Sequence, residues 1–138
     1  MVSMRESADR EGRTMSAELE GMVQDFFKAV DRLDVPAVVG FVSEDAQMVE
    51  EITRNWIRGK SNVEVAFANV AALVSNVNTE VSEFHTVVTG DSAIVTCIVN
   101  QTYTFEGNEV TIFAPTTAGF SKSEGDWKIS LIHSVPLA

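Results

Sequence analysis

Two adjacent carboxylates, Glu50 and Glu51, offer the clearest potential for chemistry in this chain. Alternate side chains of a β-strand point to the same face, so the apolar alternation through Ala46 and Met48 places Glu50 on the apolar face. Burial disfavours the charged form of a carboxylate and raises its pKa, so Glu50 could accept a proton near neutral pH. The alternative is that both glutamates are solvated at the end of a strand.

Other residue types that commonly do chemistry are few and scattered. Cys97 is the single cysteine, so the chain forms no internal disulfide and no cysteine metal cluster. A nucleophilic cysteine would need a histidine partner and a lowered pKa, so we interpret Cys97 as a small buried hydrophobe. His85 and His133 lie far apart in the sequence, and no carboxylates can be placed beside them. The sequence therefore indicates neither a metal site nor another cofactor.

The composition is that of one acidic, folded domain. Hydrophobic residues make up 45% of the 138 residues, which argues against a disordered chain. The formal net charge is −10, and such a surface repels phosphate backbones and anionic lipids, so we expect no nucleic-acid or membrane partner. No apolar run reaches the roughly 18 residues of a membrane span, and the N-terminus lacks the apolar core of a signal peptide. We therefore expect a cytoplasmic protein.

Three helices are predicted in the first half of the chain, because apolar residues recur there at every third or fourth position. Each has a start signal: a serine cap, an aspartate cap followed by proline, and a serine–glutamate capping box. These signals place the helix starts at Ser16, Asp34 and Ser61. Residues 1–15 show no periodicity, so we expect a flexible tail there and a single domain over residues 16–138.

Strands dominate the second half of the chain. Four runs rich in β-branched and aromatic residues are separated by short polar turns that contain glycine. These runs cover about residues 79–88, 92–105, 109–121 and 126–133. Short turns indicate antiparallel pairing, and helices followed by such a meander indicate an α+β fold with the helices on one face of a curved sheet.

The order of these elements and several local motifs match one known family. The motifs are the segment Phe27–Asp34 with two aspartates three residues apart, Phe41 followed by Asp45-Ala46, Gly59, and the ending Gly125–Ile129. Together they resemble the ketosteroid isomerase and SnoaL-like branch of the nuclear transport factor 2-like superfamily. The resemblance implies a cystatin-like α+β cone, with three N-terminal helices packed on a curved, mainly antiparallel sheet. It implies less about function, because this scaffold hosts isomerases, cyclases, dehydratases, epoxide hydrolases and pure binding modules.

The resemblance also relates this chain to the ketosteroid isomerase mechanism. The general-base aspartate of that family falls on Glu50, which keeps the carboxylate. The two oxyanion donors fall on Phe26, which has no hydroxyl, and on Thr116. Losing one such donor typically costs on the order of 100- to 1000-fold in rate. We therefore expect a protein that keeps the pocket and the base, without being a competent ketosteroid isomerase, and in which Tyr103 or Gln101 stabilises the developing oxyanion.

The strand faces implied by the resemblance define a pocket and an outer surface. The expected ligand is small and apolar or weakly polar, and the side chains expected to bind it are Phe26, Met48, Trp56, Phe67, Val99, Gln101, Ile112, Thr116 and Ile132. The outer face of the last strand is expected to carry Trp127, Ile129, Leu131 and His133, and to pair two copies of the chain into a homodimer. The alternative function is that of a non-catalytic ligand-binding module or a dimeric assembly module.

Overall fold

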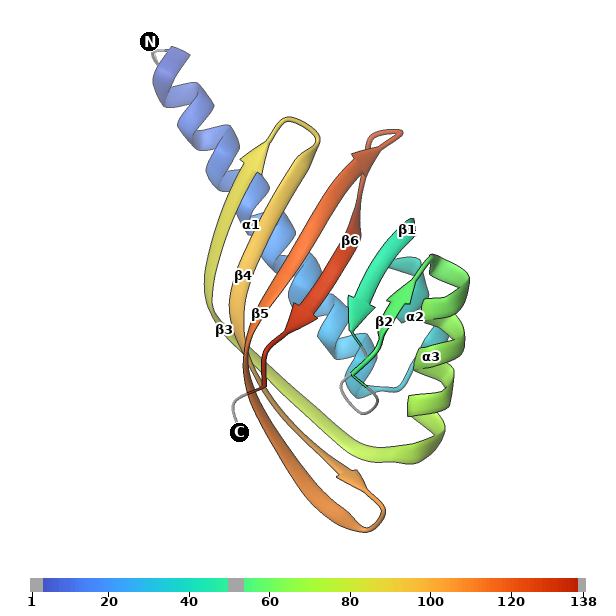
Figure 1. The fold of residues 1–138 in the computed structure, drawn as a ribbon. Coiled ribbons are helices and arrows are strands. Elements are labelled where there is room, and N and C mark those ends of the chain that lie inside the picture. The colour runs from blue at the N-terminus through green and yellow to red at the C-terminus, as the bar shows by residue number, and fades with distance from the viewer. Residues whose placement is uncertain (1–3, 50–53, 137–138) are drawn as a thin grey trace.

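The computed structural model describes residues 4–49 and 54–136, which form three helices on one face of a six-stranded sheet (Figure 1). The helices are α1 (Met4–Asp31), α2 (Val35–Gly40) and α3 (Lys60–Leu73). The strands are β1 (Val42–Val49), β2 (Trp56–Arg58), β3 (Val74–Thr89), β4 (Ser92–Phe105), β5 (Asn108–Ser123) and β6 (Asp126–Ser134).

The sheet has the strand order β2-β1-β6-β5-β4-β3. Every neighbouring pair is antiparallel except β1 and β6, which run parallel and are separated in sequence by β2, α3 and the strands β3 to β5. In Figure 1, α1 crosses behind the sheet, and α3 lies beside β1 and β2 at one end of it. The predicted α+β class, with three helices on a curved and mainly antiparallel sheet, is confirmed.

The starts of the helices were predicted with mixed success. Asp34 caps α2 as expected, because its Oδ1 accepts a hydrogen bond from the backbone N–H of Ala37 at 3.2 Å. The predicted start of the first helix at Ser16 is wrong, since α1 already begins at Met4. The capping box at Ser61 is also wrong: α3 begins at Lys60, and its cap residue is Gly59. The division into a flexible tail and a domain at residue 16 stays a prediction.

Gly59 replaces the expected serine cap for a conformational reason. Its φ of 89° lies in the left-handed region, which glycine adopts without steric cost and serine does not. Its backbone N–H also donates to the carbonyl of Ala46 at 2.8 Å, which ties the start of α3 to β1. This bond holds α3 against the sheet at the position where the cavity described below is formed.

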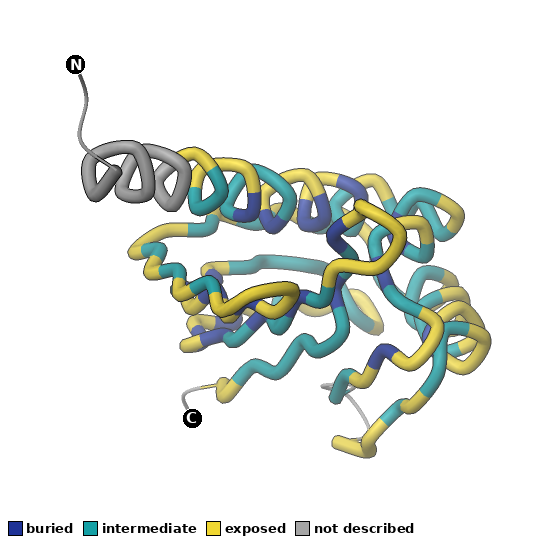
Figure 2. The backbone as a smooth tube through the Cα atoms, turned by 90° about the horizontal axis from the view of Figure 1, so that it is seen from above, coloured by how far each residue is buried: buried dark blue, intermediate teal, exposed yellow. Residues whose placement is uncertain are grey.

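The core lies between α1 and the concave face of the sheet, where buried residues of the helix and the strands face one another (Figure 2). The apolar stripe of α1 supplies one side, as its spacing predicts. Alternate residues of the strands supply the other side. Fully buried members of this core are Leu19, Val23, Ala29, Val38, Val42, Ala46, Val63, Val95, Ala118 and Ile129.

The last strand departs from the predicted alternation. Trp127 and Ile129 are buried, with 7% and 0% of their surface exposed, and belong to the core under the helices. Leu131 and His133 lie on the opposite face of the sheet. The prediction that all four residues share the outer face is therefore wrong for Trp127 and Ile129.

A β-bulge at Ser130 causes this change of face. Gly119 and Phe120 are consecutive in β5, yet they pair with Leu131 and Ile129 in β6, so Ser130 is an extra residue in the ladder. Gly119 accommodates the bulge because a Cβ atom at this position would lie 3.2 Å from the Cβ of Leu131. The extra residue shifts the alternation by one, and every side chain after it changes face.

Two further irregularities bend β3 around the helices. Asn76 and Glu83 have left-handed backbone conformations, with φ of 53° and 56°. The register between β3 and β4 shifts at both positions. Bulges of this kind increase the local bend of a strand. The sheet is therefore curved at the end where β3 follows α3, and this curvature leaves space between the helices and the sheet.

Candidate functional site

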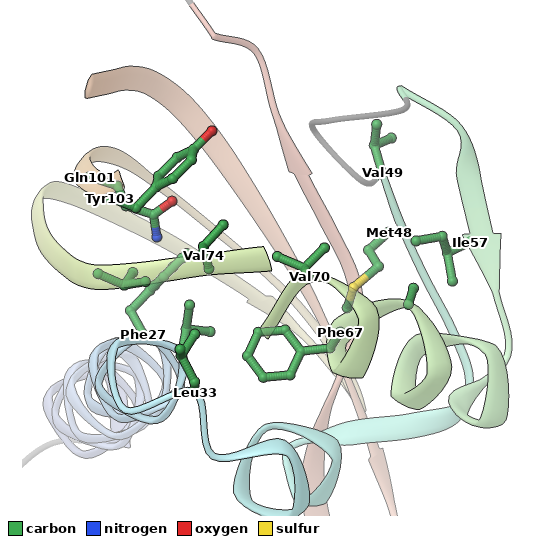
Figure 3. Close-up of a pocket in the computed structure, with 13 residues that line it drawn as sticks. Phe27, Leu33, Met48, Val49, Ile57, Phe67, Val70, Val74, Gln101 and Tyr103 are labelled. Atoms are coloured by element: carbon green, nitrogen blue, oxygen red, sulfur yellow. The ribbon is translucent and has the colours of Figure 1, made fainter. Parts of the chain in front are cut away.

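An apolar cavity of about 170 Å³ lies between the C-terminal part of α1, α3 and the curved sheet (Figure 3). Its lining is apolar except for two side chains of β4, Gln101 and Tyr103. The remaining lining residues in the described part of the chain are Phe27, Val30, Leu33, Met48, Val49, Ile57, Ala66, Phe67, Val70, Val74 and Val77. Because an apolar cavity of about 150 Å³ can hold a benzene ring, this cavity has room for a molecule with one ring.

Helical and strand periodicity place these side chains on one surface. Phe67 and Val70 are three residues apart in α3 and therefore point to the same side of the helix. Gln101 and Tyr103 are two residues apart in β4 and share the inner face of the sheet. Leu33 reaches the cavity from the turn after α1, where its backbone has a left-handed φ of 54°.

A chain of hydrogen bonds connects the cavity to the end of α1. The hydroxyl of Thr79 donates to Oδ1 of Asp31 at 2.6 Å, and the backbone N–H of Thr79 donates to Oδ2 at 3.1 Å. Nε2 of Gln101 donates in turn to Oγ1 of Thr79 at 2.9 Å. An acidic residue is unfavourable at the C-terminal end of a helix, and the two donors of Thr79 compensate the carboxylate of Asp31 there.

The family follows from the sequence of the whole domain. The model of the SnoaL-like domain matches residues 19–138. The chain belongs to the SnoaL-like domain family. The resemblance to the nuclear transport factor 2-like superfamily is thereby confirmed. A comparison with curated proteins finds no match.

Solved structures agree with this assignment of the fold. A candidate dehydratase of the NTF2-like family from Streptomyces avermitilis is similar with a TM-score of 0.82 and 20% identity, over 91% of this chain and 98% of that one. A ketosteroid isomerase-like protein from Erwinia carotovora atroseptica gives a TM-score of 0.77 and 20% identity, over 89% and 96%. A protein with a cystatin-like fold from Caulobacter vibrioides gives a TM-score of 0.78 and 15% identity, over 90% and 91%. In the described residues, no helix is both long and apolar enough to span a membrane.

Four of the predicted site residues of this SnoaL-like domain line the cavity: Met48, Phe67, Gln101 and Tyr103. Five others lie elsewhere, in or against the packed core, namely Phe26, Val99, Ile112, Thr116 and Ile132. Their side chains are buried or partly buried in the interior of the fold and do not line this cavity. The cavity lies further along the same strands, where the sheet bends away from the helices.

Phe26 and Thr116 stand at the two positions that correspond to oxyanion donors in the ketosteroid isomerases. Both side chains contact other residues of this chain. The ring of Phe26 contacts the rings of Phe27 and Phe41 edge to face, at centroid distances of 5.2 and 6.1 Å. The hydroxyl of Thr116 lies 2.8 Å from the hydroxyl of Ser134. The expectation that the SnoaL-like domain is not a competent ketosteroid isomerase stays a prediction.

Trp56, which was expected in the pocket, lies on the outer face of the sheet and is 49% exposed. Its ring lies 5.7 Å from the ring of His133, and the guanidinium of Arg58 lies 5.4 Å from its centroid. The next residue, Ile57, points the other way and lines the cavity. Trp56 is thus one residue out of phase with the predicted pocket position.

Glu50 and Glu51 lie outside the described residues, so the role predicted for Glu50 stays a prediction. Val49, which directly precedes Glu50 in the chain, lines the cavity. The sequence analysis missed several apolar lining residues, among them Val30, Leu33 and Val74. Their only sequence signal was membership of an apolar stripe, which does not distinguish a cavity wall from a filled core.

Cys97 has the environment of a structural residue. It is buried in the core, and burial raises the pKa of its thiol to about 11. The thiolate is the nucleophilic form of cysteine, and it is scarce at neutral pH when the pKa is raised. This agrees with the interpretation of Cys97 as a small buried hydrophobe.

Proposed function

We propose that this SnoaL-like domain binds a small, apolar or weakly polar molecule in the cavity and transfers a proton on it. The observation that carries the proposal is the cavity itself, which has an apolar wall and two polar side chains from one strand, Gln101 and Tyr103. Such a composition is typical of small-molecule sites, in which a few polar groups orient the ligand. The names of the dehydratase and isomerase-like structural neighbours support chemistry of this kind.

In the proposed reaction, the carboxylate of Glu50 accepts a proton from a carbon atom next to a carbonyl group of the ligand. The electron pair of the broken C–H bond moves to the carbonyl oxygen, and the hydroxyl of Tyr103 donates a hydrogen bond to the resulting oxyanion. Protonated Glu50 then returns the proton to the ligand. Met48, two residues before Glu50, lines the cavity, and the alternation of a strand supports the assignment of Glu50 as the base. The size of the cavity favours a ligand with one ring over a steroid with four.

Filling the cavity is expected to weaken ligand binding. Val70→Phe adds a ring inside the cavity, so we expect the Kd for cyclohexanone to rise by about tenfold or more relative to wild type. The matched control is Val65→Phe, which makes the same change on the same helix at a position that is 60% exposed. Titrations followed by two-dimensional amide NMR would measure both constants. Equal affinities in wild type and both variants would show that the ligand does not enter this cavity.

A second candidate function, a dimeric binding module without catalysis, is favoured by the outer face of the sheet. Large apolar side chains are exposed there on neighbouring strands, including Ile94 on β4 and Phe113 on β5. Leu131 and His133 of β6 lie on the same face. Exposed apolar patches of this kind commonly mark an interface, and a second copy of the chain would cover this one by two-fold symmetry.

Placing a charge in this surface is expected to separate the proposed dimer. Phe113 is 47% exposed, and Phe113→Glu would bury two carboxylates in a symmetric interface, where a charge without a partner is costly. We therefore expect wild type to sediment with twice the mass of one chain and Phe113→Glu with the mass of one. Val65→Glu, on α3, should sediment like wild type. A monomeric wild type at micromolar concentration would contradict the proposed dimer.

A further inference from the structure

We propose that Gln101 presents its carbonyl oxygen to the cavity and thereby favours ligands that donate a hydrogen bond at this point, such as ring-sized alcohols and ring ketones that also carry a hydroxyl group. Asp31 and Thr79 act as positioning residues that fix the orientation of the Gln101 amide. This inference rests on the proposed function in one respect, since it requires a ligand in the same cavity. It also reverses the role expected for Gln101 from the sequence, which was that of a donor to an oxyanion.

The direction of the hydrogen bond between Thr79 and Asp31 follows from the chemistry of the two groups. An ionised carboxylate can only accept hydrogen bonds, and a hydroxyl group has a single proton to donate. The 2.6 Å distance between Oγ1 of Thr79 and Oδ1 of Asp31 therefore assigns that proton to the carboxylate. The other carboxylate oxygen accepts from the backbone N–H of Thr79, which fixes the carboxylate from a second direction.

The orientation of the Gln101 amide follows from the direction of this hydrogen bond. Because the proton of Thr79 is already donated, its oxygen can only accept from Gln101, and the amide nitrogen must face it. The distance of 2.9 Å between Nε2 and Oγ1 agrees with this assignment. In Figure 3, the nitrogen of Gln101 points toward α1, and its oxygen points toward the side of Val74 and Tyr103.

The opposite orientation of the Gln101 amide would lose its hydrogen bond to Thr79. Thr79 and Gln101 are direct partners in the ladder between β3 and β4, so their backbones hold the two side chains next to one another. Rotating the amide by half a turn would place its oxygen against an oxygen that has no proton to give. A ketone in the cavity would meet the carbonyl oxygen of Gln101 without a donor, whereas an alcohol supplies one. The site therefore discriminates between two ligands of equal size.

A change of one atom at Asp31 should reverse this preference. In Asp31→Asn, the backbone N–H of Thr79 still requires an acceptor, so the new amide keeps its oxygen there and turns its NH2 group toward Oγ1 of Thr79. The hydroxyl of Thr79 then accepts from Asn and donates to Gln101. The amide of Gln101 consequently rotates, and its NH2 group faces the cavity.

The test compares cyclohexanol with cyclohexanone, which have the same ring and the same number of non-hydrogen atoms. The measured quantity is the Kd for cyclohexanone divided by the Kd for cyclohexanol, obtained by NMR titration of wild type and variants. Gln101→Leu supplies the reference ratio without the amide, and we expect wild type to favour the alcohol by about 3- to 10-fold relative to it. Asp31→Asn should lower this ratio below the value for Gln101→Leu, which means that the ketone binds relatively more tightly.

Glu20→Gln is the matched control for the substitution of Asp31. Glu20 is also a carboxylate of α1 that accepts from a threonine hydroxyl of β3, that of Thr86 at 3.0 Å, but neither residue lines the cavity. Glu20→Gln should therefore keep the wild-type ratio. If Asp31→Asn does not fold, Thr79→Val provides the same information: it removes the hydroxyl that orients Gln101, and the ratio should move toward that of Gln101→Leu.

The possible outcomes separate this inference from the proposed function. If both probes bind and the ratio is the same in wild type, Gln101→Leu and Asp31→Asn, the orientation of Gln101 does not select the ligand and the inference is wrong. Binding in the cavity would still stand in that case. If neither probe binds to wild type, the proposed small-molecule function is wrong, and the inference is overturned with it.

Discussion

Replacing Ile129 by alanine is expected to lower the free energy of unfolding by about 2 to 5 kcal/mol. Ile129 is completely buried between the sheet and α1, and truncation removes its contacts and leaves a cavity that tight packing cannot close. Its backbone N–H also donates to the carbonyl of Phe41, which ties β6 to the start of β1. Urea denaturation followed by circular dichroism would measure the loss.

Leu131→Ala is the informative control, because strict alternation would place Leu131 on the same face as Ile129. The bulge at Ser130 instead places Leu131 on the outer face, where truncation should cost about 1 kcal/mol or less. Both variants should be compared at one low protein concentration, since any dimer on the outer face adds stability that depends on concentration. Equal losses for the two variants would contradict the bulge.

The regular elements of this fold could be predicted from local pattern alone. β4 was predicted at residues 92–105 and has the bounds Ser92–Phe105. Its residues from Ala93 to Val99 are apolar or β-branched, alternate ones are buried, and a glycine turn closes each end. In such a strand the residue types, the turns and the burial all favour the same structure, so tertiary packing does not change what the local sequence predicts.

Irregular positions could not be predicted, because pairing between strands determines them. Trp127, Ile129, Leu131 and His133 alternate in sequence as if they shared one face. The extra residue at Ser130 becomes visible only when β6 is aligned with β5. The one local signal was Gly119, whose missing side chain makes room for Leu131, but a glycine in a strand has several possible explanations.

The candidate site likewise contains residues that local pattern could predict and contacts that depend on long-range packing. Met48, Phe67 and Gln101 were predicted to bind a ligand and Tyr103 to stabilise an oxyanion, and all four line the cavity. The support for Gln101 could not be predicted, since the hydrogen bond between Thr79 and Asp31 joins residues separated by 48 positions. Only the packing of α1 against β3 brings these two side chains together.

The largest expected effect on activity is that of Glu50→Gln. An amide cannot accept the proton of a C–H bond, so the substitution should lower the rate of proton transfer by about 100- to 10,000-fold. A measurement that requires no knowledge of the natural substrate is the exchange of the α-protons of cyclohexanone for deuterium in D2O, followed by NMR. The adjacent Glu51→Gln is the matched control, because the alternation of a strand predicts opposite faces for the two carboxylates, and its exchange rate should equal that of wild type.

The pH dependence of this exchange would report the environment of the base. Only the ionised carboxylate accepts a proton, so the exchange rate should rise as the pH increases through the pKa of Glu50. An apolar environment disfavours the charged form, which predicts a midpoint well above the ordinary value of about 4.3. A titration of the carboxyl carbon by NMR, assigned with Glu50→Gln, should give the same midpoint. Equal exchange rates in wild type and Glu50→Gln would remove the catalytic role of Glu50, and binding in the cavity, measured separately with Val70→Phe, would then describe a module without catalysis.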